Sequence, residues 1–245
     1  MRRFWLLSVL LPLWLASGCT TILRADFESD PIGSGPSADL PGFPSGDRLS
    51  LPNVRFSGSV SVIEARAVGD EERRELRIES RVDLSEPGRP RRIDEDFVAA
   101  RFVSIPVSFP DRPIGTTIRG RIGANSGRLD MYFGDDQNCG ALRLRLEDDR
   151  IIRLSPNYEP TGVLGELLGG FDFSITVFVD RSTDTGTLLT SGRALNLRET
   201  FALPSCVAAS TWERNVLMLG FVSPAGRGSV IWLDVVEMSE NTRGE

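Results

Sequence analysis

Alternation of apolar and polar residues is the feature of this sequence that most restricts its fold. Leu142, Leu144 and Leu146 alternate with Arg143 and Arg145, and the same period recurs at residues 54–62, 76–84 and 173–179. A period of two is that of a β-strand with one buried face. Turn-forming residues separate these stretches roughly every 8–12 residues. The sequence therefore predicts an antiparallel all-β domain, with the arginines of 142–146 facing water and one short helical turn at 164–168.

The N-terminus has the pattern of an export signal. Arg2 and Arg3 precede an apolar stretch at 4–16, which is shorter than the about 20 residues that cross a bilayer and has the size of a signal peptide core. It ends in Leu-Ala-Ser-Gly-Cys at 15–19. This resembles the lipobox of bacterial lipoproteins, although Ala16 stands where that family usually has Leu. The resemblance implies a diacylglycerol on Cys19 and removal of residues 1–18. The alternative is a plain secretory signal, with Cys19 incidental.

The same resemblance predicts how the chain is divided and where it is located. Residues 1–18 would be the lipoprotein signal peptide, 19–26 a lipidated tether and 27–240 a single β-sandwich domain. Lipoproteins resembling those of enterobacteria are retained in the inner membrane by Asp after the Cys, and here Thr20 follows instead. We therefore expect a cell-envelope protein that is anchored by lipid, with the outer membrane favoured.

Composition excludes several kinds of chemistry. The chain contains neither His nor Lys. It therefore has no Ser-His-Asp triad, no His-ligated zinc or haem site, no Schiff-base lysine and no P-loop lysine. Its formal net charge is −6, and this acidity argues against nucleic acid as a partner, because such binding depends on basic patches.

The cysteines predict one disulfide bond. The chain has 3 cysteines, and lipid on Cys19 would leave Cys139 and Cys206 as a pair. An even pair in an exported protein favours a disulfide. The alternative is two free, buried thiols.

Three segments together suggest a particular β-sandwich. Ala-Asp-Phe-Glu-Ser-Asp stands at 25–30, a long hairpin pattern with a Thr-Gly turn at 173–192, and an apolar stretch holding an Asp at 230–238. This order resembles the concanavalin A-like, or laminin G-like, jelly-roll superfamily. The resemblance implies an antiparallel two-sheet β-sandwich. A generic β-sandwich and a lipocalin-like barrel remain the alternatives.

The loop at 134–140 is a candidate calcium site. Asp135, Asp136 and Asn138 offer side-chain oxygens, the ligands that Ca²⁺ prefers, and laminin G-like domains often carry calcium on such loops. The alternative is an Asx-type turn between two strands, held in place by Cys139. No other cofactor is expected.

Two aromatic residues are candidates for stacking on sugar rings. Trp212 lies among polar residues, and Tyr158 lies in a stretch that reads as a loop. Either ring could be exposed and stack on a ligand. The alternative is that both rings cap the edge of the core.

No catalytic residues can be assigned from the sequence. Glycosidases that share the jelly-roll fold commonly use a Glu-x-Asp-x-x-Glu run, which is absent here. We therefore expect a non-enzymatic envelope lipoprotein whose domain binds a glycan or a protein partner. The alternatives are a carbohydrate-active enzyme with paired carboxylates, which glycoside hydrolysis requires, and a purely structural or assembly lipoprotein.

Overall fold

The structure of this chain is a computed structural model. It describes residues 19–25, 27, 61–69, 74–82, 98–108, 111–123, 128–135, 137, 139–222 and 230–241. The predicted signal peptide at 1–18 lies outside these ranges. Within them, all but one of the regular elements are strands.

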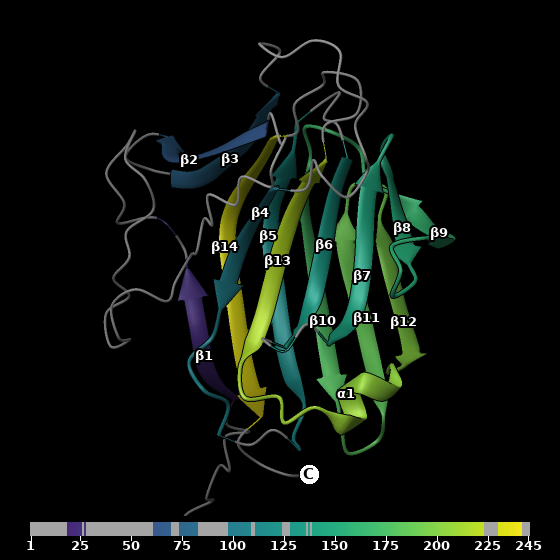
Figure 1. Cartoon of the computed structure of the whole chain (residues 1–245). Coiled ribbons are helices and arrows are strands. Elements are labelled where there is room, and N and C mark those ends of the chain that lie inside the picture. Colours follow the sequence, from purple (N-terminus) through teal and green to yellow (C-terminus); the bar gives the residue numbers. More distant parts are fainter. Residues whose placement is uncertain are drawn as a thin grey trace, which may run out of the picture.

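The strands form two antiparallel sheets that face each other as two layers (Figure 1). Sheet A has 8 strands in the order β12-β11-β10-β5-β14-β3-β2, with β1 also paired to β14. Sheet B has 6 strands in the order β4-β13-β6-β7-β8-β9. The strands of sheet A are β12 (Asn196–Ala202), β11 (Thr185–Gly192), β10 (Asp172–Asp180), β5 (Ile114–Ile122), β14 (Val230–Asn241), β3 (Arg74–Val82), β2 (Ser61–Gly69) and β1 (Cys19–Ala25). Those of sheet B are β4 (Val98–Val103), β13 (Asn215–Val222), β6 (Arg128–Asp135), β7 (Gly140–Glu147), β8 (Arg150–Leu154) and β9 (Pro160–Glu166).

The core lies between the two sheets and is built from the apolar members of the alternating stretches. Leu144 on β7, Ile175 on β10 and Ile118 on β5 are fully buried. Burying a side chain of this size contributes about 1.5–3 kcal/mol. The predicted fold class, an antiparallel two-sheet β-sandwich, is confirmed.

On sheet B, an arginine that was predicted to face water is buried instead. Arg145 was expected to face water, but only 5% of it is exposed. Its Nε lies 2.9 Å from the carboxylate of Asp130, and its Nη2 donates to the carbonyl of Tyr158 at 3.1 Å. The segment between β8 and β9 thus provides a carbonyl partner for an arginine of β7, which the local alternation of β7 does not reveal.

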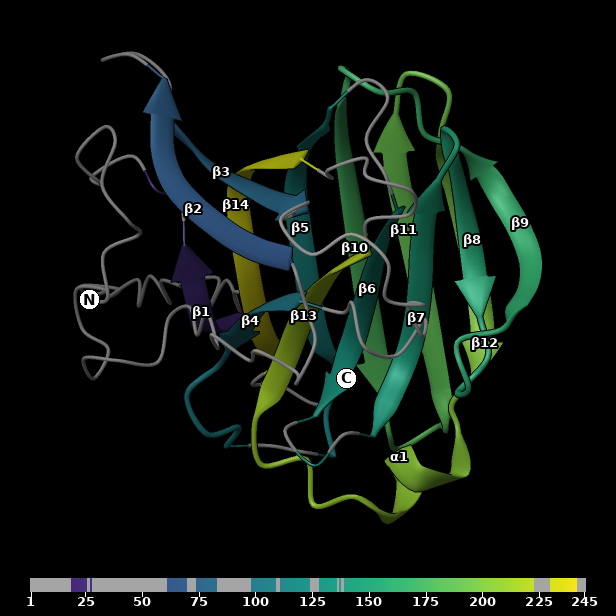
Figure 2. The ribbon, with the colours of Figure 1, turned by 45° about the horizontal axis from the view of Figure 1, so that its top comes forward.

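The segment at 19–26 was expected to be a tether, but its first seven residues form β1. Cys19 pairs with Asn241, and Ala25 with Val236. Ile22 and Leu23 are buried, and their burial accounts for the strand. β1 and β3 share one side of β14, since β3 pairs with the opening half of β14 and β1 with its closing half. Figure 2 shows the curved β2–β3 pair beside these strands.

The only helix among the described residues is α1 (Ser205–Ala209). The expected helical turn at 164–168 is wrong, because β9 extends to Glu166 and pairs with β8. Leu164 is only partly buried and packs against the core.

Candidate functional site

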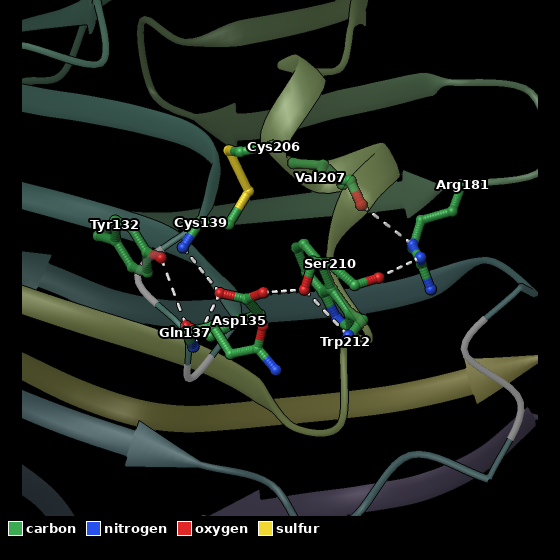
Figure 3. The surroundings of a disulfide bond; sticks show 9 residues. All are labelled: Tyr132, Asp135, Gln137, Cys139, Arg181, Cys206, Val207, Ser210 and Trp212. Carbon is green, nitrogen blue, oxygen red and sulfur yellow. Dashed lines mark hydrogen bonds between the residues drawn. A yellow bond between two sulfur atoms is a disulfide. The ribbon is translucent and has the colours of Figure 1, made fainter.

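The end of β6 carries a buried carboxylate that organises the neighbouring loop (Figure 3). Asp135 is fully buried. Its Oδ1 accepts hydrogen bonds from the backbone N–H of Gln137 at 3.0 Å and of Cys139 at 2.8 Å. Its Oδ2 accepts a hydrogen bond from the hydroxyl of Ser210. These contacts form the Asx-type turn that the sequence offered as the alternative to a calcium loop.

The calcium site at this loop stays a prediction, because only Asp135 of its three residues is described. Both oxygens of Asp135 already accept hydrogen bonds from the protein. Asp136 and Asn138 lie outside the described residues. Within the described ranges, no three Asp, Glu, Cys or His side chains come together in a way that could hold a metal ion.

Cys139 and Cys206 form the predicted disulfide (Figure 3). Their Cα atoms are 5.8 Å apart, across a sequence separation of 67 residues. The bond joins the residue before β7 to the second residue of α1. It therefore ties the start of a sheet B strand to the segment that follows β12 of sheet A.

The stacking prediction is wrong for Trp212. Its side chain is fully buried and belongs to the hydrophobic core, so a ligand in solvent cannot reach the ring. The backbone explains the burial, because the N–H of Trp212 donates to the hydroxyl of Ser210 at 3.0 Å and holds the chain against the Asp135 turn. Two of the polar neighbours that suggested exposure, Ser210 and Thr211, contact this turn instead.

Tyr158 lies on the turn between β8 and β9 and is partly exposed. Its φ is 63°, a left-handed conformation that a bulky residue adopts only where other contacts hold it. The guanidinium carbon of Arg143 lies 4.4 Å from the centre of its ring. This contact covers one part of the ring and ties Tyr158 to β7.

A pocket lies beside this turn, where β7 and β8 of sheet B approach β12 of sheet A. We call it the β7–β12 pocket, and its volume is about 140 Å³. A cavity of about 150 Å³ holds a six-membered ring. Its lining residues are Gly140, Ala141, Leu142, Arg143, Arg153, Leu154, Pro156, Phe201, Ala202 and Pro204.

The two arginines of the β7–β12 pocket come from opposite faces of sheet B. Arg153 is paired across the strands with the core residue Leu144. Directly opposed residues share a face, so Arg153 extends into the space between the sheets. There its Nη1 lies 2.8 Å from the Oε1 of Glu199, and its guanidinium carbon lies 5.2 Å from the ring centre of Phe201. Arg143 is paired with Tyr132 and belongs to the other face.

The disulfide supports two walls of this pocket. Gly140, which follows Cys139, and Pro204, which lies two residues before Cys206, both line it. Sequence reasoning identified Arg143 only as a solvent-facing residue and did not single out Arg153 or Phe201. The β7–β8 hairpin carries the two arginines, and the packing of sheet A against sheet B brings Phe201 on β12 beside them, which no local spacing signals.

The predicted anchor position lies elsewhere on the domain. Cys19 is an exposed free thiol at the first residue of β1. No helix within the described part of the chain has the length and apolar character needed to cross a bilayer.

No protein-family profile matches this sequence. No curated protein matches it either. Several solved structures resemble the fold. A GH131 beta-glucanase catalytic domain from Podospora anserina aligns with a TM-score of 0.53 and 10% identity, over 92% of this chain and 97% of that chain. The CBM2 module of the Lactobacillus casei BL23 phage J-1 evolved Dit aligns with a TM-score of 0.51 and 12% identity, over 93% and 98%.

A botulinum neurotoxin type C structure, described as entering cells through two ganglioside molecules, aligns with a TM-score of 0.51 and 7% identity over 92% of this chain. The chain spans 48% of the neurotoxin chain and 19% of a sialidase chain. At these identities the likeness concerns the fold. The chain is therefore an antiparallel two-sheet β-sandwich, and its fold is similar to the folds of these proteins.

Proposed function

We propose that this chain is a lipid-anchored protein of the cell envelope whose β-sandwich binds a glycan, without catalysis, in the β7–β12 pocket. The observation that carries the proposal is the pocket itself. Its volume, about 140 Å³, is that of one six-membered ring. Ligand sites typically combine apolar walls with a few polar groups that fix orientation. Here Leu142, Leu154 and Phe201 supply apolar surface, and two arginines supply hydrogen-bond donors.

The lining favours binding over hydrolysis of a glycan. Glycoside hydrolysis by the usual route needs two carboxyl groups on either side of the scissile bond. The described residues that line the pocket include no Asp and no Glu. Glu199 contacts the lining residue Arg153, but the contact is an ion pair.

The names of two similar structures agree with a carbohydrate ligand. One is a beta-glucanase, and another concerns ganglioside recognition by a toxin. These names support the class of ligand only, since the identities of 10% and 7% carry no residue of those sites to this chain.

The anchoring part of the proposal rests on the lipobox-like sequence at 15–19 and on the exposure of Cys19. An acyl chain must remain outside the folded domain in order to enter a bilayer. The exposed position of Cys19 at the start of β1 meets that requirement. Thr20, rather than Asp, after the Cys favours the outer membrane.

A pocket-blocking variant tests the binding part of the proposal. Ala202 lines the pocket and is exposed, so Ala202→Trp should fill the opening with little effect on folding. Ala208 is also exposed but lies on α1 outside the lining, and Ala208→Trp is the matched control. On an immobilised glycan panel, we expect the wild-type chain and the control to bind the same glycans and Ala202→Trp to lose them. Retained binding by Ala202→Trp, or no binding by any of the three proteins, would contradict the proposal.

A further inference from the structure

The predicted anchor position shares one face of sheet A with an exposed phenylalanine. Strands β10, β5, β14 and β1 lie side by side in that order (Figure 1). Phe178 on β10 is directly opposite Gly115 on β5. Gly115 is opposite Ser239 on β14, which in turn is opposite Thr21 on β1. Directly opposed residues point to the same face, and Cys19 precedes Thr21 by two positions on β1, so its side chain points to that face as well.

This shared face is the outer face of sheet A, which is directed away from the core. Phe178 stands between the buried residues Val177 and Val179 and is itself 37% exposed. Its ring leans over β5, on the side of β1, because a Cβ atom at Gly115 would lie 2.9 Å from Cε1 of Phe178. Glycine at that position leaves room for the ring. The strand spacing and the rise per residue place Cys19 and Phe178 about 16 Å apart.

We propose that the outer face of sheet A around Phe178 lies against the lipid bilayer when Cys19 is acylated. This inference rests on the proposed lipid anchor and adds the orientation of the domain to it. Acyl chains on Cys19 leave the domain on the face that carries Phe178, so they enter the bilayer from that face. Apolar side chains on the surface of a lipid-bound protein insert at the boundary between the headgroups and the acyl chains. Phe178 is such a side chain, and the anchor keeps it close to that boundary.

The residues around Phe178 suit a headgroup layer. The cross-strand row that contains Phe178 has no charged member among its described residues, which are Thr21, Ser239, Gly115, Phe178, Thr187 and Thr200. Farther along the same face, the exposed Arg119 and Arg198 can donate hydrogen bonds to lipid phosphates. The nearby carboxylates are already engaged, since Glu237 lies 3.4 Å from Arg24 and Asp180 accepts hydrogen bonds within its own hairpin. This part of the face therefore offers hydroxyls, a ring and two cations, although the chain has a net charge of −6.

Quenching of a fluorescent label by lipid tests this orientation. The acylated full chain, purified in detergent, is reconstituted into vesicles of phosphatidylcholine and phosphatidylglycerol in which some lipids carry a nitroxide high on the acyl chain. Acylation occupies Cys19, and a disulfide joins Cys139 to Cys206. A newly introduced cysteine is therefore the free thiol that a fluorophore labels.

Three label positions separate this face from the other sheet. Thr187→Cys and Thr200→Cys place the label in the row of Phe178. Val163→Cys is the matched control, because Val163 is 60% exposed on β9 of sheet B. We expect strong quenching of the labels at Thr187 and Thr200 and little quenching of the label at Val163.

A second variant tests whether Phe178 makes the contact. In Phe178→Ser, the ratio of quenched to unquenched label at Thr187 should fall about threefold, because only about a third of the Phe178 side chain is available for burial in lipid. Val163→Ser removes another exposed apolar side chain and should leave this ratio unchanged. Circular dichroism checks that all variants are folded.

The outcomes distinguish the orientation from the anchor. Absence of quenching at both Thr187 and Thr200, in a chain that floats with the vesicles, would overturn the inference and leave the lipid anchor intact. Equal quenching at all three positions would also overturn it, because the domain would then have no preferred face. Unchanged quenching in Phe178→Ser would show that the Phe178 row does not contact the lipid. A chain that carries no acyl group and does not float with the vesicles would remove the proposed anchor, and the inference with it.

Discussion

The hydroxyl of Ser210 donates a hydrogen bond to the buried carboxylate of Asp135, across a separation of 75 residues. The same hydroxyl accepts from the backbone N–H of Trp212 at 3.0 Å. Ser210 thus joins the end of β6 to the segment after α1. The guanidinium of Arg181 also reaches this segment, where it donates to the carbonyls of Val207 and Ser210. One corner of the sandwich is therefore held by polar contacts as well as by the disulfide (Figure 3).

Replacing Ser210 by Ala should destabilise this corner. The change removes the donor to Oδ2 of Asp135 and leaves part of a buried carboxylate without its partner, at a cost of about 1–3 kcal/mol. Urea denaturation followed by circular dichroism measures the difference. Ser205→Ala is the control, because Ser205 is an exposed residue of α1; we expect less than about 0.5 kcal/mol there. Equal stability of both variants would show that the Asp135 contact is not structural.

Removing the disulfide should lower stability more strongly. In the chain-entropy model, a bridge across 67 residues contributes about 4 kcal/mol, because it restricts the unfolded chain. The double variant Cys139→Ser, Cys206→Ser should therefore unfold at a clearly lower urea concentration than wild type. Because Gly140 and Pro204 flank the bridge and line the β7–β12 pocket, glycan affinity should also fall under conditions where the variant is still folded. Unchanged glycan affinity under those conditions would show that the disulfide does not support the β7–β12 pocket.

Replacing Trp212 by Ala should lower the stability of the fold much more than replacing Trp232 by Ala. Trp212 is fully buried, and a core Trp→Ala change costs about 3–5 kcal/mol. Trp232 is only partly buried, and the guanidinium carbon of Arg121 lies 4.9 Å from its ring centre. Losing a cation–π contact of this kind costs about 0.5–1 kcal/mol, in addition to a smaller loss of buried area. Thermal and urea unfolding of Trp212→Ala and Trp232→Ala should show this order, and the reverse order would contradict the burial of Trp212.

A chelator should not change the stability of the Asp135 turn. A structural calcium ion would stabilise the folded state in proportion to its affinity, so its removal would lower the melting temperature. Since hydrogen bonds already occupy both oxygens of Asp135, we expect the same melting temperature with EDTA and with added calcium. A calcium-dependent increase would instead favour the loop site with Asp135, Asp136 and Asn138.

Cys19 should determine membrane association. Several acyl tails give a durable anchor, since each buried CH₂ contributes about 0.8 kcal/mol. Cys19→Ser should therefore abolish labelling by a fatty-acid probe and move the protein from the membrane fraction to the soluble fraction. A second variant, Thr20→Asp, should keep the lipid but shift the protein to the inner membrane. Unchanged partitioning of Cys19→Ser would show that another segment anchors the chain.

Some features of this structure could be predicted from local sequence patterns, whereas others depend on contacts between segments. Alternation correctly identified the core-facing leucines of β7, because that property belongs to a single strand. It failed for Arg145, whose partners Asp130 and Tyr158 come from other segments. The β7–β12 pocket depends on the packing of β12 in sheet A against the β7–β8 hairpin of sheet B, so its residues could not be grouped beforehand. Cys139 and Cys206 could be paired because cysteine chemistry leaves few choices.

The pairing of β1 with β14 begins at Cys19 itself, and this limits how an acylated domain could move. A long disordered linker lets a domain explore a wide volume above the bilayer. Here, the acyl chains would be attached to the first residue of a strand that is paired into sheet A. The β-sandwich would stay at a nearly constant height above the membrane surface and would adopt a restricted set of orientations. Ligands would then reach it in the thin layer next to the lipid headgroups, and a polymer fixed in that same layer would be encountered far more often than one free in solution.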